Sequence, residues 1–93
     1  MEKERKRVEA ERRQQVSKKL QPLKKKLESV ETAIEQMELR KQEIEMMMAE
    51  PELYKDGDEA KKTSHEYKEL QAKLKSTYFE WGKLTEEIDR MKA

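Results

Sequence analysis

Two stripes of apolar residues, each spaced three and four positions apart, constrain the fold more than any other feature of this 93-residue chain. The first stripe comprises Val16, Leu20, Leu23, Leu27, Val30, Ile34, Met37, Lys41, Ile44 and Met48. The second comprises Ala60, Thr63, Tyr67, Leu70, Leu74, Thr77, Trp81, Leu84, Ile88 and Met91. A seven-residue repeat keeps one side of a helix facing a partner helix. Two such stripes separated by a short turn predict an all-α fold, an antiparallel two-helix coiled-coil hairpin.

The start of the first helix is predicted from Pro22. Proline suits the first helical position, whereas inside a helix it costs about 3 kcal/mol. We therefore expect the first helix to begin near Pro22 and to cover residues 21–49. Residues 1–20 precede this point, and the first fifteen of them are rich in Lys, Arg, Glu and Gln and offer little to bury. They are predicted to form a basic arm or linker, helical or frayed.

The segment between the stripes has the composition of a turn, which we expect at residues 50–58. Pro51 biases the residue before it away from helical geometry. Asp56 has the spacing of a helix N-cap relative to Glu59. The second helix is predicted over residues 58–92, so that residues 21–93 form the hairpin.

In an antiparallel hairpin centred on this turn, each residue of the first stripe faces a residue of the second. Ile44 is then predicted to face Tyr67, and Leu27 to face Leu84. Residues 1–17 are left without a partner. Lys41 interrupts the first stripe, and we expect its stem to pack while its ammonium reaches Glu66 or Glu69 on the second helix. The alternative is that this single polar residue fixes the register of the seam.

The composition excludes several classes of protein. Charged residues make up 46% of the chain and hydrophobic residues 33%, which is too polar for an ordinary globular core but enough for a two-helix seam. There is no cysteine, so disulfides and thiolate metal sites are excluded. Nothing resembles a signal peptide or a membrane span, and we expect a cytoplasmic protein with no membrane partner.

No group of residues suggests catalysis. The single histidine, His65, falls on an outward position of the second helix, where we expect a solvated side chain rather than a metal ligand. Two glycines cannot form a glycine-rich phosphate loop. The chain is therefore expected to be non-catalytic, with no metal and no cofactor of its own.

Charge is distributed unevenly along the chain. Residues 1–26 hold eleven Lys or Arg against four Glu, a net charge of +7, while residues 27–93 hold eleven basic and seventeen acidic residues, a net charge of −6. A basic end on an acidic rod indicates a polyanionic partner. The candidate nucleic-acid-binding residues are Arg12, Arg13, Lys18, Lys19, Lys24, Lys25 and Lys26. The alternative is that these charges only keep an exposed helix in solution.

Several short motifs, in their order along the chain, resemble one family. They are the run Glu-Pro-Glu-Leu-Tyr at 50–54, the heptads that lead to Trp81 and Leu84, and the run Gln-Pro-Leu-Lys-Lys at 21–25. Together they resemble the C-terminal domain of ABC-F ATPases, the Uup-like branch of the ATP-binding cassette superfamily. The basic run before residue 21 is similar to the tether that follows the second cassette in that family.

This resemblance implies a parent protein with two ATP-binding cassettes, which bind ATP and Mg and act on ribosomes and translation. The cassettes lie outside this chain, so none of their residues can be assigned here. The family's C-terminal coiled coil has been linked to DNA binding, which implies DNA or ribosomal RNA as the partner. Pro51, Tyr54 and Trp81 match positions that look structural.

Two other interpretations remain open at this point. The chain could be a protein-interaction or spacer coiled coil without nucleic-acid binding, and Leu39, Met46 and Phe79, on outward positions, could form a second contact surface. It could also be a homodimer of long helices, although the turn favours a monomeric hairpin.

Overall fold

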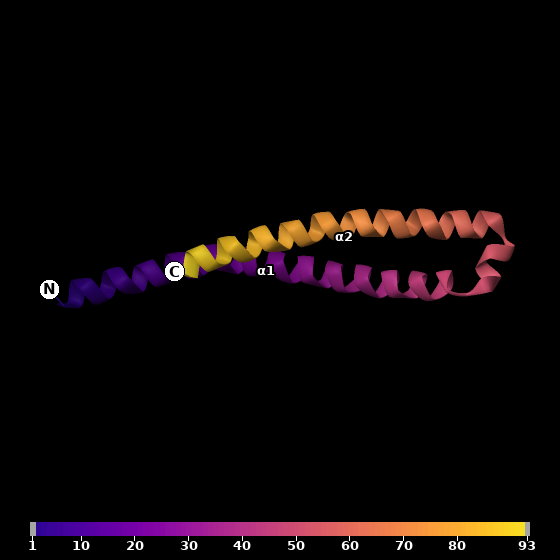
Figure 1. Ribbon diagram of the computed structural model, residues 1–93. Helices are drawn as coiled ribbons and strands as arrows, with labels where there is room; N and C mark the ends of the chain where they lie inside the picture. The colour runs from indigo at the N-terminus through magenta and orange to yellow at the C-terminus, as the bar shows by residue number, and fades with distance from the viewer. Residues whose placement is uncertain (1, 93) are drawn as a thin grey trace.

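The computed structural model describes residues 2–92, and side chains from residue 5 onward. It contains a long helix α1 (Glu2–Met48), a short 3-10 helix η1 (Pro51–Lys55) and a second long helix α2 (Gly57–Lys92). α1 and α2 run antiparallel, side by side, and η1 joins them at one end, which we call the tip (Figure 1). The rod measures 80 × 15 × 15 Å. The predicted antiparallel two-helix hairpin is confirmed.

The predicted start of the first helix is wrong. α1 is already helical at Glu2 and passes through Pro22 without a break. Pro22 is exposed, so water can reach the carbonyl of Lys18, which loses its helical hydrogen-bond donor. The residues on both sides are mostly Lys, Arg, Glu, Gln and Leu, which favour helix strongly. The basic arm is thus a helical continuation of the hairpin, and α1 extends beyond the end of α2 (Figure 1).

The core is a single seam between the two helices. Its buried residues all belong to the two stripes: Val30, Thr63, Ile44, Leu74, Leu84 and Ile88. The side chain of Ile44 is fully buried, with 0% exposure. Trp81 is the least buried member of either stripe, at 38%. The seven-residue spacing therefore identified the residues that hold the helices together.

Two tyrosines of α2 fix the register of this seam by hydrogen bonds to α1. The Tyr67 hydroxyl donates to Glu45 Oε1 at 3.0 Å, beside the residue that Tyr67 was predicted to face. The Tyr78 hydroxyl donates to Glu38 Oε1, also at 3.0 Å. Each bond raises the pKa of the tyrosine above its usual value, because the neighbouring carboxylate favours the protonated phenol.

A forked ion pair holds the middle of the rod. Arg40 donates to Glu66 through Nε at 2.7 Å and through Nη2 at 3.0 Å, and to Glu43 on its own helix through Nη1 at 2.9 Å. The prediction that Lys41 reaches Glu66 or Glu69 is therefore wrong, because Arg40 occupies the carboxylate of Glu66 and Glu69 lies beside His65 on its own helix. Lys41 instead lies 3.9 Å from Glu45 Oε1 on its own helix.

The Arg40–Glu66 pair predicts a pH-dependent stability. The guanidinium holds the pKa of the Glu66 carboxyl below its usual value. Such a group stabilises the fold above its unfolded-state pKa of about 4.3, and the contribution is lost as the pH falls through the folded-state pKa. We expect Glu66→Gln to lower the urea midpoint at pH 7 and to have a much smaller effect at pH 3. Glu31→Gln, at an exposed position of α1, is the control, and equal effects of Glu66→Gln at both pH values would contradict the prediction.

The tip closes with its own hydrogen bonds. Glu50 has extended backbone geometry (φ −85°, ψ 126°), as expected before a proline. The Tyr54 hydroxyl donates to the Met48 carbonyl at 2.7 Å and so satisfies one carbonyl at the end of α1. Asp56 caps α2, because its Oδ1 accepts the Asp58 N–H at 3.0 Å. The observed ends of the turn agree with the predicted turn to within two residues.

Candidate nucleic-acid interface

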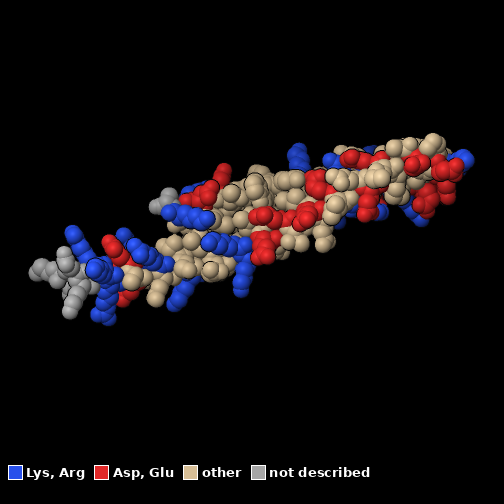
Figure 2. Space-filling model, turned by 90° about the horizontal axis from the view of Figure 1, so that it is seen from below, with Lys and Arg blue, Asp and Glu red and all other residues tan. Residues whose placement is uncertain are grey.

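The seven predicted basic residues all lie on α1 within residues 12–26, and all are exposed: Arg12, Arg13, Lys18, Lys19, Lys24, Lys25 and Lys26. At 1.5 Å per residue they extend over about 21 Å of helix. Figure 2 shows Lys and Arg side chains along this end of the rod, whereas Asp and Glu are more frequent towards the tip. The uneven charge of the sequence therefore gives the rod a basic end, where α1 extends beyond α2, and a more acidic end at the tip.

These cations are available to a partner. Among the side chains of residues 5–92, none of the seven lies within 4.0 Å of a carboxylate. The ion pair nearest to them in the sequence joins Arg7 to Glu11 at 3.8 Å. Arg40 differs from them, because its guanidinium donates hydrogen bonds to Glu66 and Glu43, and these bonds raise its pKa.

The seven residues do not form one face of the helix. Lys18 and Lys25 are seven residues apart and share the outward side of α1, opposite the seam. Arg12, Arg13 and Lys24 instead lie around the end of α2, together with Lys92. A partner that engages all seven would therefore have to wrap around α1.

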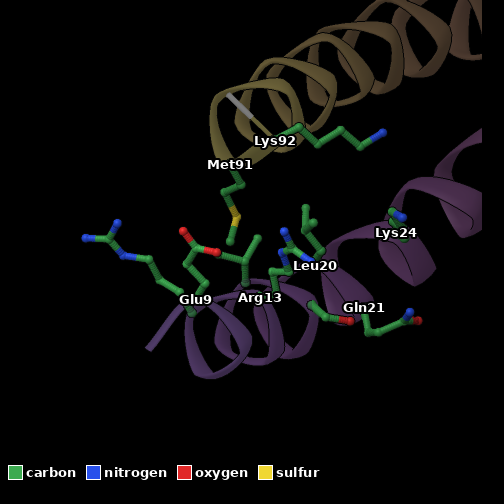
Figure 3. Close-up of a pocket in the computed structure, with 10 residues that line it drawn as sticks. Glu9, Arg13, Leu20, Gln21, Lys24, Met91 and Lys92 are labelled. Carbon is green, nitrogen blue, oxygen red and sulfur yellow. The ribbon is translucent and has the colours of Figure 1, made fainter. Parts of the chain in front are cut away.

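A groove lies where α2 ends on the surface of α1, and we call it the open-end groove (Figure 3). Its volume is about 420 Å³. Its lining residues are Glu9, Arg12, Arg13, Val16, Ser17, Leu20, Gln21, Lys24, Met91 and Lys92. Figure 3 shows Met91 reaching from the last turn of α2 towards Glu9, Arg13 and Leu20 of α1. Three apolar side chains are thus surrounded by four cationic ones and one carboxylate.

Lys92 was not among the residues predicted from the sequence. It belongs to the mostly acidic part of the chain, so a count of charges along the sequence does not associate it with the basic arm. The predicted register contained the missing signal, because it brings the end of the second helix close to Leu20. The groove itself could not be predicted, since the expected start of the helix near Pro22 left its α1 side unassigned.

The rest of the described chain offers neither a metal site nor a membrane-spanning helix. Among the side chains of residues 5–92, no three His, Cys, Asp or Glu are placed to hold a metal ion. His65 is exposed and lies 3.1 Å from Glu69. No helix in the described part of the chain has the length and apolar character needed to cross a membrane.

The three outward apolar residues are exposed, as their heptad positions predicted. Leu39 is 56% exposed, Met46 72% and Phe79 67%. The Lys83 ammonium lies 4.7 Å from the centre of the Phe79 ring, a cation–π contact on the outer side of α2. Whether these residues form a second contact surface stays a hypothesis.

Comparison with known families finds a match for most of the chain. Residues 18–86 match the ABC transporter C-terminal domain. No curated protein and no solved structure matches the chain. The matched region includes five of the seven candidate residues, from Lys18 to Lys26, and the whole tip. It confirms the resemblance to the C-terminal domain of an ABC-F-type ATPase, while the Uup-like branch stays a prediction. The chain therefore belongs to the ABC transporter C-terminal domain family.

Proposed function

We propose that this chain is the non-catalytic C-terminal coiled coil of an ABC-F ATPase and that it binds nucleic acid, either DNA or ribosomal RNA. The contact is made by the basic N-terminal third of the chain. The parent hydrolyses ATP with Mg in its cassettes and acts on ribosomes and translation in the cytoplasm. Membership of the ABC transporter C-terminal domain family supports the link to such a parent.

The observation that carries this proposal is the exposure of seven basic side chains on one continuous helix, with no carboxylate of residues 5–92 within 4.0 Å of them. Lysine and arginine bind phosphates by charge and by the release of counterions, and no fixed motif is needed. The net charge of −6 over residues 27–93 repels phosphates. Binding is therefore limited to one end of the rod.

Reversing the charge of three neighbouring lysines tests the proposal. We expect the triple substitution of Lys24, Lys25 and Lys26 by Glu to weaken binding of a duplex DNA and of an RNA hairpin by at least about a hundredfold at low salt. The matched control replaces Lys61, Lys62 and Lys68 by Glu, which changes the net charge equally near the tip. Fluorescence anisotropy of labelled nucleic acid measures both.

Two results would count against nucleic-acid binding at this surface. If the unmodified domain binds neither nucleic acid at low salt, the protein-interaction or spacer coiled coil becomes the better account. If the two triple variants weaken binding equally, the effect comes from net charge and the basic third is not the site. Circular dichroism confirms that both variants keep the helical hairpin.

A further inference from the structure

We propose that the open-end groove accommodates an unpaired nucleotide, so that this chain prefers nucleic acid with single-stranded segments over a continuous duplex. This inference rests on the proposed function and names the substrate class of the same site. It follows from the apolar side chains Val16, Leu20 and Met91, which form the floor of the groove and which a bound phosphate would not cover.

The groove combines two kinds of surface. Val16, Leu20 and Met91 form its apolar part, and Arg12 and Arg13, with Lys24 and Lys92, supply positive charge around it. Leu20 and Met91 are half-buried rather than buried, so part of their apolar surface remains in contact with water. A ligand that covers this surface gains about 25 cal/mol for each Å² removed from water.

A nucleotide matches this combination because it carries a phosphate and a planar base with largely apolar faces. In a duplex the base faces are stacked on one another, and only phosphates, sugars and base edges face outward. A duplex can therefore satisfy the four cations but leaves the apolar floor uncovered. An unpaired base is free to lie on the floor while the flanking phosphates contact the cations.

The dimensions and the chemistry of the floor agree with this occupant. The groove is open on the surface of the rod rather than enclosed, and its volume is about 420 Å³. The lining contains no aromatic ring, so an unpaired base would lie on the aliphatic groups of Val16 and Leu20 and on the thioether of Met91. The polarisable thioether of Met91 packs well against aromatic rings in general.

Glu9 opposes phosphate binding at the same groove. Its carboxylate lines the groove beside Arg13 (Figure 3). We expect Glu9→Gln to strengthen binding of single strands and duplexes alike, because it removes a negative charge without altering the floor. Arg13→Gln is expected to weaken both.

The test compares Met91→Ala with Met46→Ala, which removes the same atoms from an exposed position of α1 outside the groove. The ligands are a single strand of about twenty nucleotides and the duplex of the same length. We expect the unmodified chain to bind the single strand more tightly than the duplex at equal salt. Met91→Ala should weaken single-strand binding about three- to tenfold and change duplex binding less than about twofold. Met46→Ala should change neither.

A second variant and a second readout guard against indirect effects. Val16→Ala also shortens the floor and should act in the same direction as Met91→Ala, even if one of them loosens the end of the hairpin. The fluorescence of a 2-aminopurine base in the single strand should change on binding to the unmodified chain and less on binding to Met91→Ala. Equal affinity for both ligands, with no effect of Met91→Ala or Val16→Ala, would overturn this inference and leave nucleic-acid binding intact. Failure to bind either ligand would overturn the proposed function itself.

Discussion

Replacing Ile44 by alanine is expected to lower the free energy of unfolding by about 2–4 kcal/mol. Ile44 is the one residue of the described chain whose side chain is large and fully buried. It sits in the seam of a rod only two helices wide, and few other apolar side chains of this rod are buried. The loss combines the transfer of apolar atoms back to water with the cavity that remains. Because small domains are stable by only about 5–15 kcal/mol, this single substitution should remove a large share of the total.

Thermal unfolding followed by circular dichroism at 222 nm measures this effect. For a domain of this size, each kcal/mol corresponds to a fall of about 4–8 °C in Tm. Met46→Ala is the matched control, since Met46 is two residues away on the same helix and 72% exposed. An unchanged Tm for Ile44→Ala would mean that the seam is not built around this residue.

The affinity of the chain for duplex DNA is expected to fall about a hundredfold between about 50 and 200 mM salt. Each phosphate contact adds about 0.9 to the slope of log K against log salt, and about four contacts give this decrease. Seven exposed cations over one stretch of α1 are sufficient for that number. The triple substitution of Lys24, Lys25 and Lys26 by Glu should reduce the slope by about 2–3.

The control for this slope is the triple variant of Lys61, Lys62 and Lys68, which should bind with the slope of the unmodified chain. Anisotropy titrations at four or more salt concentrations give the slopes of all three proteins. A slope near zero for the unmodified chain would show that binding, if present, does not depend on phosphate contacts. Such a result would remove the physical basis of the proposed interface.

The hairpin itself could be predicted because the seven-residue repeat can be recognised from the spacing of apolar residues along the sequence. Every buried residue of the structure belongs to one of the two predicted stripes, and Asp56 caps α2 as its position before Glu59 suggested. The start of α1 could not be predicted in the same way. The free-energy cost of a proline inside a helix favoured a break at Pro22. The helix-forming residues around Pro22 and its exposed position nevertheless allow the helix to continue.

The polar contacts across the seam were the least predictable part. Several carboxylates lie within reach of Arg40 and Lys41, and spacing alone does not decide which pairs form. The planar fork of Arg40 binds both oxygens of Glu66, a geometry that the single ammonium of Lys41 cannot match. Because Arg40 binds Glu66, the carboxylate near Lys41 is that of Glu45 on the same helix.

The candidate site was predictable as a charge distribution but not as a shape. The seven basic residues are where the sequence placed them, on an exposed end of the rod. The open-end groove depends on where α2 stops against α1, which brings Met91 and Lys92 next to Arg13 and Leu20. That contact joins residues far apart in the sequence, and among the sequence patterns only the register of the two stripes indicates it.

The most direct test of the central claim is an NMR titration of the isotopically labelled chain with nucleic acid at low salt. The account predicts that amide shifts change in the basic third, within residues 5–26, and at Met91 and Lys92, while residues 50–68 at the tip keep their positions. Shifts that change mainly at the tip, or no changes at all at saturating nucleic acid, would contradict it.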